Sequence, residues 1–341
     1  MADQEAEEKH SREMKPSAEP KSPGLSWYGV MYAALAAIGY ATANAFLRQL
    51  SDGTPHEWVV TCKAGCTTLI FLPWLLFVFA TGRIKSRIFP PLKICLLLFV
   101  AALFVQLAGN LAFQWSLEQI GMALSVPLLM SIMIIAGATL GKICLGEPVS
   151  GVMKIVMVMF IAAIFLLGLG AANPSQPEVN ITSKTWPVLG AIAAASAGFA
   201  YAFLGLSLRT SLKYNIPLAT PMVIVGATGV VMIGTMTFRN HGFEIVRSTD
   251  GPTWFCLIGA ALCNSLAFLS LSKAFKHLPL VYVNVTNVAQ IAMTTLTAIF
   301  YFGERFSMQL GIGLAIMFAG YLILGSQPRK SPAASKPAQD D

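Results

Sequence analysis

The sequence has few charged residues for its length. Only 11% of the 341 residues are Asp, Glu, Lys or Arg, whereas 55% are hydrophobic. Soluble domains carry about 25% charged residues, so this chain cannot cover a water-facing surface with them. The composition excludes an ordinary soluble globular protein and predicts a chain of several membrane-spanning helices.

Sequence signals for catalysis, metal binding and cofactors are also missing. No HExxH or GxSxG motif occurs, and the apolar segments hold no paired acids or histidines. An intramembrane enzyme would need an activated nucleophile, an acid/base pair or a metal site. We therefore expect no catalytic residues, no metal and no cofactor. The six cysteines all lie in apolar runs, where they behave as small hydrophobic residues.

Carboxylates are absent from the interior of every long apolar run. The acidic residues nearest to these runs, Glu57, Glu118, Glu147 and Glu304, all lie at their ends. Proton-coupled carriers commonly use a carboxylate or histidine inside the membrane. A facilitator or an exchanger therefore fits the sequence at least as well as a proton-coupled carrier.

Ten apolar runs are long enough to span a membrane. A helix needs about 20 apolar residues to cross about 30 Å of hydrocarbon. The runs are residues 26–47, 58–80, 94–116, 121–145, 151–170, 187–208, 217–238, 253–272, 279–302 and 308–325. Residues 1–25 and 326–341 are polar and rich in proline, which predicts disordered tails.

The distribution of positive charge predicts how these spans are oriented. An even number of spans places both tails on one side. Fifteen of the 23 lysines and arginines fall on that side, five fall on the other and three lie within spans. Because cytoplasmic segments carry an excess of Lys and Arg, both termini are expected in the cytoplasm. The protein is expected to be a multi-pass protein of a plasma or inner membrane. Its basic residues do not cluster with aromatic residues, so we expect no nucleic-acid partner.

The chain contains an internal repeat with an offset of 304 − 147 = 157 residues. At this offset "ANAFL" (43–47) falls on "AYAFL" (200–204), and "CLGEPVS" (144–150) falls on "YFGERFS" (301–307). Each half has five spans, and an odd number makes the second half cross in the opposite direction. We therefore expect an inverted repeat of residues 26–170 and 187–325, joined by an outer linker at 171–186.

Each half ends its fourth span with a Gly-Glu step, and we expect both steps to be structural corners. The residues are Gly146, Glu147, Gly303 and Glu304. Glycine closes a helix in a left-handed conformation. The carboxylate then lies just before the next helix, near its partial positive end, with Ser150 or Ser307 as the cap.

Ten spans in two halves, each with "LGEPVS" or "FGERFS" after its fourth span, resemble the EamA-type members of the drug/metabolite transporter superfamily. The resemblance covers roughly residues 26–325. It implies a central cavity lined by spans one to four and six to nine, with spans five and ten peripheral and at a homodimer contact. It also implies transport of small organic solutes by alternating access. Members often have a proline early in both fourth helices; here Pro127 fits, but its equivalent is Asn284.

Polar side chains at membrane depth are the candidate substrate-binding residues, because a polar group in hydrocarbon is costly unless it is paired or faces a cavity. They are Tyr40, Asn44, Lys63, Gln106, Asn110, Tyr201, Asn264, Asn284, Asn287, Gln290 and Thr294. Gln106 and Asn110 share a helical stripe with Gln114, and residues 284–297 present amides and hydroxyls on one face. The alternative is that these groups only form hydrogen bonds between helices.

Lys63 has two interpretations. It lies about five residues inside the second span, so its stem can extend to the membrane surface and keep the ammonium in water. Alternatively, it faces the cavity and attracts an anionic group of the solute.

The function predicted by these patterns is a secondary transporter of a small polar or amphipathic organic solute, such as an amino acid or a drug-like metabolite. The first alternative is an exchanger of nucleotide sugars or phosphorylated metabolites, although such substrates would need several cations in the cavity. A membrane sensor or scaffold that does not transport is the second alternative. The expected partners are the solute, the lipid bilayer and a second copy of the chain.

Overall fold

The computed structural model describes residues 27–81, 90–145, 151–171, 186–212, 214, 216–217, 219–277, 280–304 and 307–325. All regular structure in these ranges is helical, as the sequence predicts. The helices are α2 (Trp27–Gln49), α3 (His56–Ala80), α4 (Leu92–Phe104), the π-helix η1 (Val105–Leu111), α5 (Ala112–Ile120), α6 (Met122–Leu145), α7 (Gly151–Ala171), α8 (Trp186–Leu212), α9 (Ala219–His241), α10 (Glu244–Ser248), α11 (Gly251–His277), α12 (Leu280–Phe300) and α13 (Met308–Gly325).

Each of the ten apolar runs coincides with a helix or with a continuous series of helices. Within the described ranges, seven helical stretches are long and apolar enough to cross a membrane. Shorter apolar stretches lie at Gly151–Ile164, Ala289–Phe300 and Met308–Ile323. The sequence did not predict the short helix α10, nor the π-helix that divides the third run into α4, η1 and α5.

Proline and glycine set several helix ends. Pro55 and Pro91 immediately precede α3 and α4, where the missing N–H of proline costs no hydrogen bond. α5 ends at Gly121, whose φ of 74° and ψ of 174° belong to a region that only glycine adopts readily. The chain can therefore turn directly from α5 into α6.

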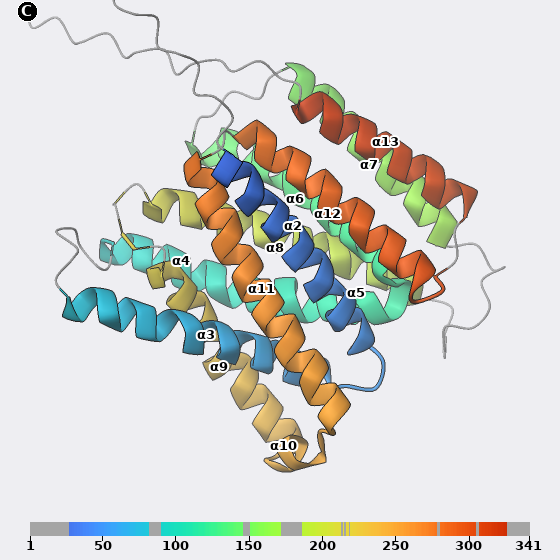
Figure 1. The fold of residues 1–341 in the computed structure, drawn as a ribbon. Coiled ribbons are helices and arrows are strands. Elements are labelled where there is room, and N and C mark those ends of the chain that lie inside the picture. Colours follow the sequence, from blue (N-terminus) through green and yellow to red (C-terminus); the bar gives the residue numbers. More distant parts are fainter. Residues whose placement is uncertain are drawn as a thin grey trace, which may run out of the picture.

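The helices pack mainly as pairs that are distant in sequence (Figure 1). α2 packs against α11 and α12, whereas α8 packs against α6 and against the series α4, η1 and α5. α3 packs against α9, and α7 packs against α13. In Figure 1 the α7–α13 pair lies at one edge of the bundle, and α10 lies at its lower tip.

Small residues allow some of these helices to approach closely. A Cβ at Gly198 of α8 would overlap the Leu129 carbonyl oxygen of α6. The two backbones are therefore in direct contact there. Membrane helices commonly associate through small residues in this way, because lipid gives little hydrophobic force to bring them together.

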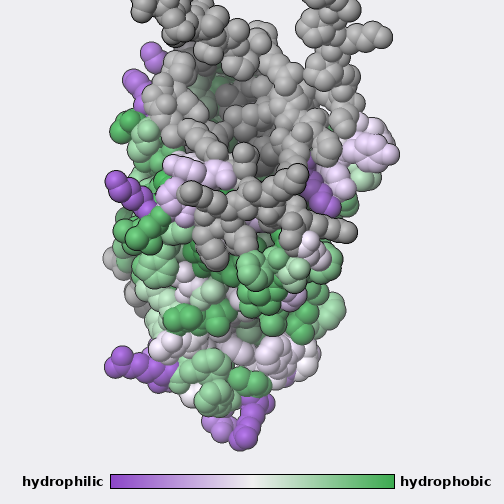
Figure 2. All heavy atoms as spheres, turned by 90° about the vertical axis from the view of Figure 1, so that its left-hand side faces the viewer, coloured by the Kyte–Doolittle hydropathy of each residue, from purple (hydrophilic) through white to green (hydrophobic). Residues whose placement is uncertain are grey.

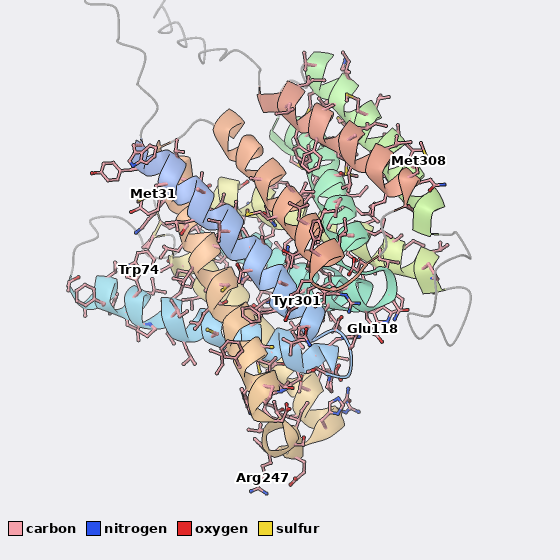
Figure 3. All side chains as sticks on the ribbon, turned by 45° about the vertical axis from the view of Figure 1, so that its right-hand side comes forward. Met31, Trp74, Glu118, Arg247, Tyr301 and Met308 are labelled. Carbon is pink, nitrogen blue, oxygen red and sulfur yellow. The ribbon has the colours of Figure 1, made fainter. Side chains whose placement is uncertain are left out.

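On the face shown in Figure 2, hydrophobic side chains form a band, with hydrophilic ones below it, toward the α10 end, and above it. Many large apolar side chains are exposed, including Leu69 at 75%, Val231 at 69% and Val158 at 66%. Figure 3 shows Arg247 of α10 pointing away from the bundle at its lower tip. A soluble monomer rarely exposes so much apolar surface, and a lipid-facing surface accounts for it.

Candidate functional site

A buried polar cluster joins α3, η1 and α8. The Lys63 ammonium of α3 donates a hydrogen bond to Oδ1 of Asn110 in η1. The Tyr201 hydroxyl of α8 donates to the same oxygen at 2.7 Å. Lys63 is 9% exposed and Asn110 is 8% exposed. Lys63 and Asn110 belong to the first half of the chain and Tyr201 to the second, so the cluster spans both halves.

The cluster continues through two amides to the backbone of α9. Asn110 Nδ2 donates to Gln106 Oε1 at 2.8 Å, and Gln106 Nε2 donates to the Val225 carbonyl at 2.8 Å. A carbonyl oxygen can only accept, so it fixes the orientation of the Gln106 amide and, through it, that of Asn110. The Asn110 oxygen is thereby held toward Lys63.

The π-helix places Gln106 and Asn110 side by side. Both lie within Val105–Leu111, and Gly229 of α9 makes room for Gln106, because a Cβ at Gly229 would lie 2.6 Å from Gln106 Nε2. Gln114, expected on the same stripe, instead donates to the Leu47 carbonyl of α2 at 2.8 Å. The wider turn of a π-helix changes the angular spacing of the residues that follow.

Lys63 lies well inside the bundle. It is the eighth residue of α3, so its backbone is about 10 Å along the axis from His56. The ammonium turns toward the buried amide of Asn110. Within the described ranges, no carboxylate pairs with Lys63, and Asn110 is its hydrogen-bond partner.

Other expected binding residues surround this cluster or lie on neighbouring helices. The Tyr40 hydroxyl of α2 lies close enough to that of Tyr201 to interact with it electrostatically. Asn44, one turn further along α2, is buried at 8% exposure. Asn264 of α11 is half-buried. Its neighbour Ser265 lies 3.2 Å from the Thr67 hydroxyl of α3.

The expected residues of α12 are described only in part. Gln290 and Thr294 are buried at 4% and 0% exposure, and the Thr294 hydroxyl donates to the Gln290 carbonyl at 2.8 Å. The backbone of Asn284 and Asn287 is helical, but their side chains lie outside the described residues.

Glu304 joins the two halves at the α10 end of the bundle. Its carboxylate accepts hydrogen bonds from the backbone N–H groups of Met122 and Ala123, both at 2.8 Å, at the N-terminus of α6. Arg48 Nε of α2 donates to the same carboxylate at 3.1 Å. Gly303 precedes it with a φ of 65°.

The position of Glu304 differs from the expectation that it would lie at the N-terminus of the helix that follows it. That helix, α13, is capped by Ser307, whose hydroxyl accepts from Leu310 N at 3.1 Å. The residue before α6 is Gly121, which has no side chain to cap with, so Glu304 supplies the acceptor from the other half. Gly146 and Glu147 lie outside the described residues.

Two histidine–carboxylate pairs at this end were not expected. His56 of α3 lies 2.9 Å from Glu118 of α5, and His241 of α9 lies 2.9 Å from Glu57 of α3. The partners of each pair are far apart in sequence, so no local spacing signals them.

Asp250, just before α11, is a further acidic residue at this end. Hydrogen bonds from Thr253 hold the pKa of its carboxyl group below the usual value.

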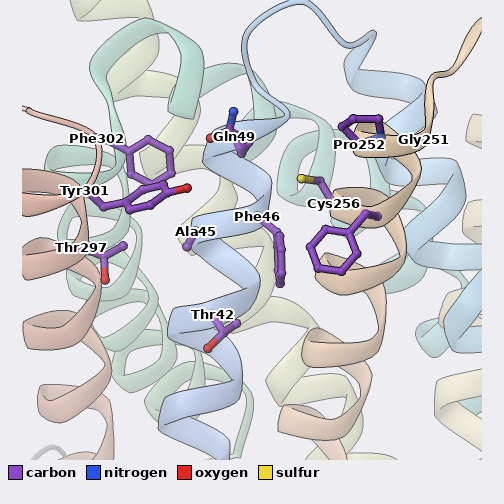
Figure 4. A pocket seen from close by; sticks show the side chains of 11 residues that line it. Thr42, Ala45, Phe46, Gln49, Gly251, Pro252, Cys256, Thr297, Tyr301 and Phe302 are labelled. Carbon is purple, nitrogen blue, oxygen red and sulfur yellow. The ribbon is translucent and has the colours of Figure 1, made fainter.

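Two hollows lie outside the buried cluster. A groove of about 650 Å³ is bordered by α2, α11 and α12 (Figure 4). Figure 4 shows Phe46 pointing from α2 toward α11, with Tyr301 and Phe302 at the end of α12. A second hollow of about 370 Å³ lies beside α10 and is lined by residues that include His241, Glu244 and Asp250.

The chemistry available in the cluster is binding chemistry. Lys63 provides one positive charge, Asn110 an amide, and Tyr40 and Tyr201 hydroxyls. In the part of the chain that the structure describes, no three His, Cys, Asp or Glu residues are placed to hold a metal ion. These groups can orient a polar solute through hydrogen bonds and one charge.

Comparison with known proteins favours a membrane transporter. No family model matches the sequence. A segment of 147 residues is 22% identical to "Uncharacterized transporter YwfM" of Bacillus subtilis (strain 168) and covers 43% of this chain. The match spans about half (49%) of that relative's length. A crystal structure described only as "Crystal structure of protein" is similar with a TM-score of 0.59 at 14% identity, over 87% of this chain and 96% of the other. Because the identity is only 14%, the similarity to this crystal structure concerns the fold alone.

Proposed function

We propose that this protein is a secondary transporter of the EamA type, which moves a small polar or amphipathic organic solute across a membrane by alternating access. The observation that carries the proposal is the buried cluster of Lys63, Asn110 and Tyr201, which lies between the two halves of an apolar helical bundle. In transporters built from inverted repeats, the binding site lies at the interface between the repeats.

The pairing of helices supports two equivalent halves. At the offset of 157 residues, α3 corresponds to α9 and α7 to α13, and each of these pairs is in contact. The contact of α2 with α11 corresponds to that of α8 with the series α4, η1 and α5. The contact of α2 with α12 corresponds to that of α8 with α6. A two-fold axis in the membrane plane would relate all these contacts.

Glu304 has a counterpart under the same relation. It caps α6, the fourth span of the first half, from the second half. Glu147, its counterpart at the offset of 157 residues, lies outside the described residues. We expect neither glutamate to contact the solute.

The remaining features of the proposal concern the membrane and the partners. The distribution of Lys and Arg in the sequence predicts both termini in the cytoplasm, in which case the α10 end would face outward. The α7–α13 pair lies at the edge of the bundle, where a second copy of the chain would bind.

The test is counterflow in proteoliposomes that contain the purified full-length chain. Vesicles are loaded with single amino acids or with other small metabolites, and uptake of the labelled compound is measured. The proposal expects saturable uptake that is stimulated by the internal solute. Tyr201→Phe, which removes the hydroxyl from the cluster, should reduce this uptake. The matched variant Tyr214→Phe, in the half-exposed turn after α8, should not.

Two results would contradict the proposal. One is no counterflow of any tested solute by folded protein. The other is labelling of cysteines at positions 147 and 304 from the same side of the membrane, because an inverted repeat places these positions on opposite sides.

A further inference from the structure

The strongest unexplained feature of the cluster is the positive charge of Lys63. The side chain is 9% exposed and, among the described residues, faces a neutral amide and no carboxylate. A buried charge is normally paired or coordinated, because its transfer from water is costly. An ammonium also has three N–H donors, and one is used by Asn110. The charge therefore lacks a counter-ion that the described part of the chain could supply.

The groups next to Lys63 are arranged to act together with it. The Asn110 oxygen accepts from both Lys63 and Tyr201, so it holds the ammonium and the hydroxyl of Tyr201 close to one another. The amide cannot rotate away, because Gln106 and the Val225 carbonyl fix it. The Tyr40 hydroxyl of α2 interacts electrostatically with that of Tyr201. One cation and one hydroxyl, from α3 and α8, thus meet at the Asn110 oxygen, and a second hydroxyl, from α2, is within electrostatic reach.

We propose that Lys63, Tyr201 and Tyr40 form the subsite for the carboxylate of the transported solute, with Asn110 as the positioning residue. This inference rests on the proposed function and narrows the solute to small organic acids and amino acids. When the solute binds, its carboxylate becomes the counter-ion of Lys63. Tyr201 has a single O–H, so it would turn this donor from the Asn110 oxygen to the carboxylate, and Tyr40 would supply a second donor.

The composition of the subsite favours a carboxylate over a phosphate. A phosphate monoester carries about −1.5 to −2 charges at pH 7 and three strong acceptor oxygens. Lys63 offers one positive charge, which balances a single carboxylate but leaves part of a phosphate's charge without a counter-ion.

The placement of the subsite also fits transport. Lys63 and Tyr40 belong to the first half and Tyr201 to the second. A bound carboxylate would therefore contact both halves and would stabilise the arrangement in which they enclose it. Tyr40 and Tyr201 lie near the middle of α2 and α8, at the depth expected for a solute site in such transporters.

The test uses acetate, acetamide and inorganic phosphate as probes, because they are small enough for the subsite alone and differ in charge. Thermal unfolding of the purified full-length protein is measured with each probe at matched ionic strength, with chloride as the reference. We expect acetate to raise the Tm and acetamide to leave it unchanged. Lys63→Gln should weaken the apparent acetate affinity by about 10- to 100-fold, as expected for loss of a hydrogen bond to a charged group.

Two further variants complete the design. Lys63→Arg keeps the charge and should retain part of the acetate effect. Lys142→Gln removes an exposed lysine at the end of α6 and should retain all of it. Lys63→Gln removes a buried charge, whose transfer from water is costly, and keeps a donor for Asn110, so this variant should fold. Comparing acetate with acetamide on the unsubstituted protein tests, without any variant, whether the subsite prefers a carboxylate to a neutral group of the same size.

Several outcomes would overturn the inference. They are equal effects of acetate and acetamide, an undiminished acetate effect in Lys63→Gln, and a phosphate effect that depends on Lys63 and exceeds that of acetate. Counterflow of neutral solutes that is unaffected by Lys63→Gln would overturn the subsite and leave the transporter in place. Acetate binding that depends on Lys63, without counterflow of any carboxylate, would instead contradict the proposed function alone.

Discussion

Glu304→Gln tests whether the link between the two halves contributes to stability. The carboxylate of Glu304 accepts from Met122 N, Ala123 N and Arg48 Nε, and its side chain is 14% exposed. Glutamine keeps the shape but has one acceptor oxygen and no charge. Its NH₂ group would face one of the N–H groups of α6, so at least one hydrogen bond is lost. The bonds that remain are no longer assisted by charge.

The expected loss follows from these contacts. Hydrogen bonds to charged groups contribute about 1.5 to 3 kcal/mol and neutral ones about 1 kcal/mol. A negative charge at a helix N-terminus adds about 0.3 to 1 kcal/mol. One lost bond and weakened neighbours therefore lower the free energy of unfolding by about 3 kcal/mol. With an unfolding entropy of about 2.1 cal/mol/K per residue, a chain of 341 residues would show a decrease in Tm of about 4 °C.

The measurement is thermal unfolding of the purified protein in detergent, followed by tryptophan fluorescence. Glu244→Gln is the matched control, since the Glu244 side chain is 79% exposed and its partner Arg247 lies 3.5 Å away and is 81% exposed. Exposed pairs of this kind contribute little, and the control should change the Tm by about 1 °C or less. If Glu304→Gln were as stable as Glu244→Gln, the structural role assigned to Glu304 would be wrong.

Further predictions concern the backbone and one helix cap. Gly121→Ala should lower the Tm by several degrees, because Gly121 has a φ of 74° and a Cβ there would lie 2.7 Å from the carboxyl group of Glu304; an unchanged Tm would contradict the turn geometry. Gly198→Ala should also destabilise, because its Cβ would overlap α6, whereas Gly205→Ala on the same helix meets nothing within 4 Å and should be neutral or stabilising. Equal Tm values for the two variants would contradict the close approach of α8 to α6 at Gly198. Asp250 has a lowered pKa. Its contribution to the stability of the folded protein is therefore present above its ordinary pKa and is lost as the pH falls through the lowered value. Asp250→Asn should therefore flatten the acid side of the curve of Tm against pH. An unchanged curve would contradict the role of Asp250 as the cap of α11.

The helical segments could be predicted from the sequence, because each needs only a long apolar run between polar breaks. All ten runs coincide with helical segments, with ends that differ by a few residues. Buried polar residues could also be anticipated from their position in these runs. Lys63, Asn110 and Tyr201 were all expected as binding residues, and the structure brings them together.

The contacts between distant segments could not be predicted. The capping role of Glu304 depends on α6, whose N-terminus lies 182 residues earlier in the chain. The pairs of His56 with Glu118 and of His241 with Glu57 likewise depend on tertiary structure. The π-helix has no local composition that distinguishes it from an α-helix, so the sequence did not predict that Gln106 and Asn110 bond to each other while Gln114 bonds to the Leu47 carbonyl.

The cap that α6 receives from Glu304 makes the first half of the chain incomplete by itself. A fragment ending near residue 171 would lack Glu304, so the backbone N–H groups of Met122 and Ala123 at the start of α6 would lose their acceptor. The halves should therefore be poor autonomous folding units, yet they should assemble when produced together as separate polypeptides. Cutting the chain between α7 and α8 and co-expressing the pieces would reveal such complementation.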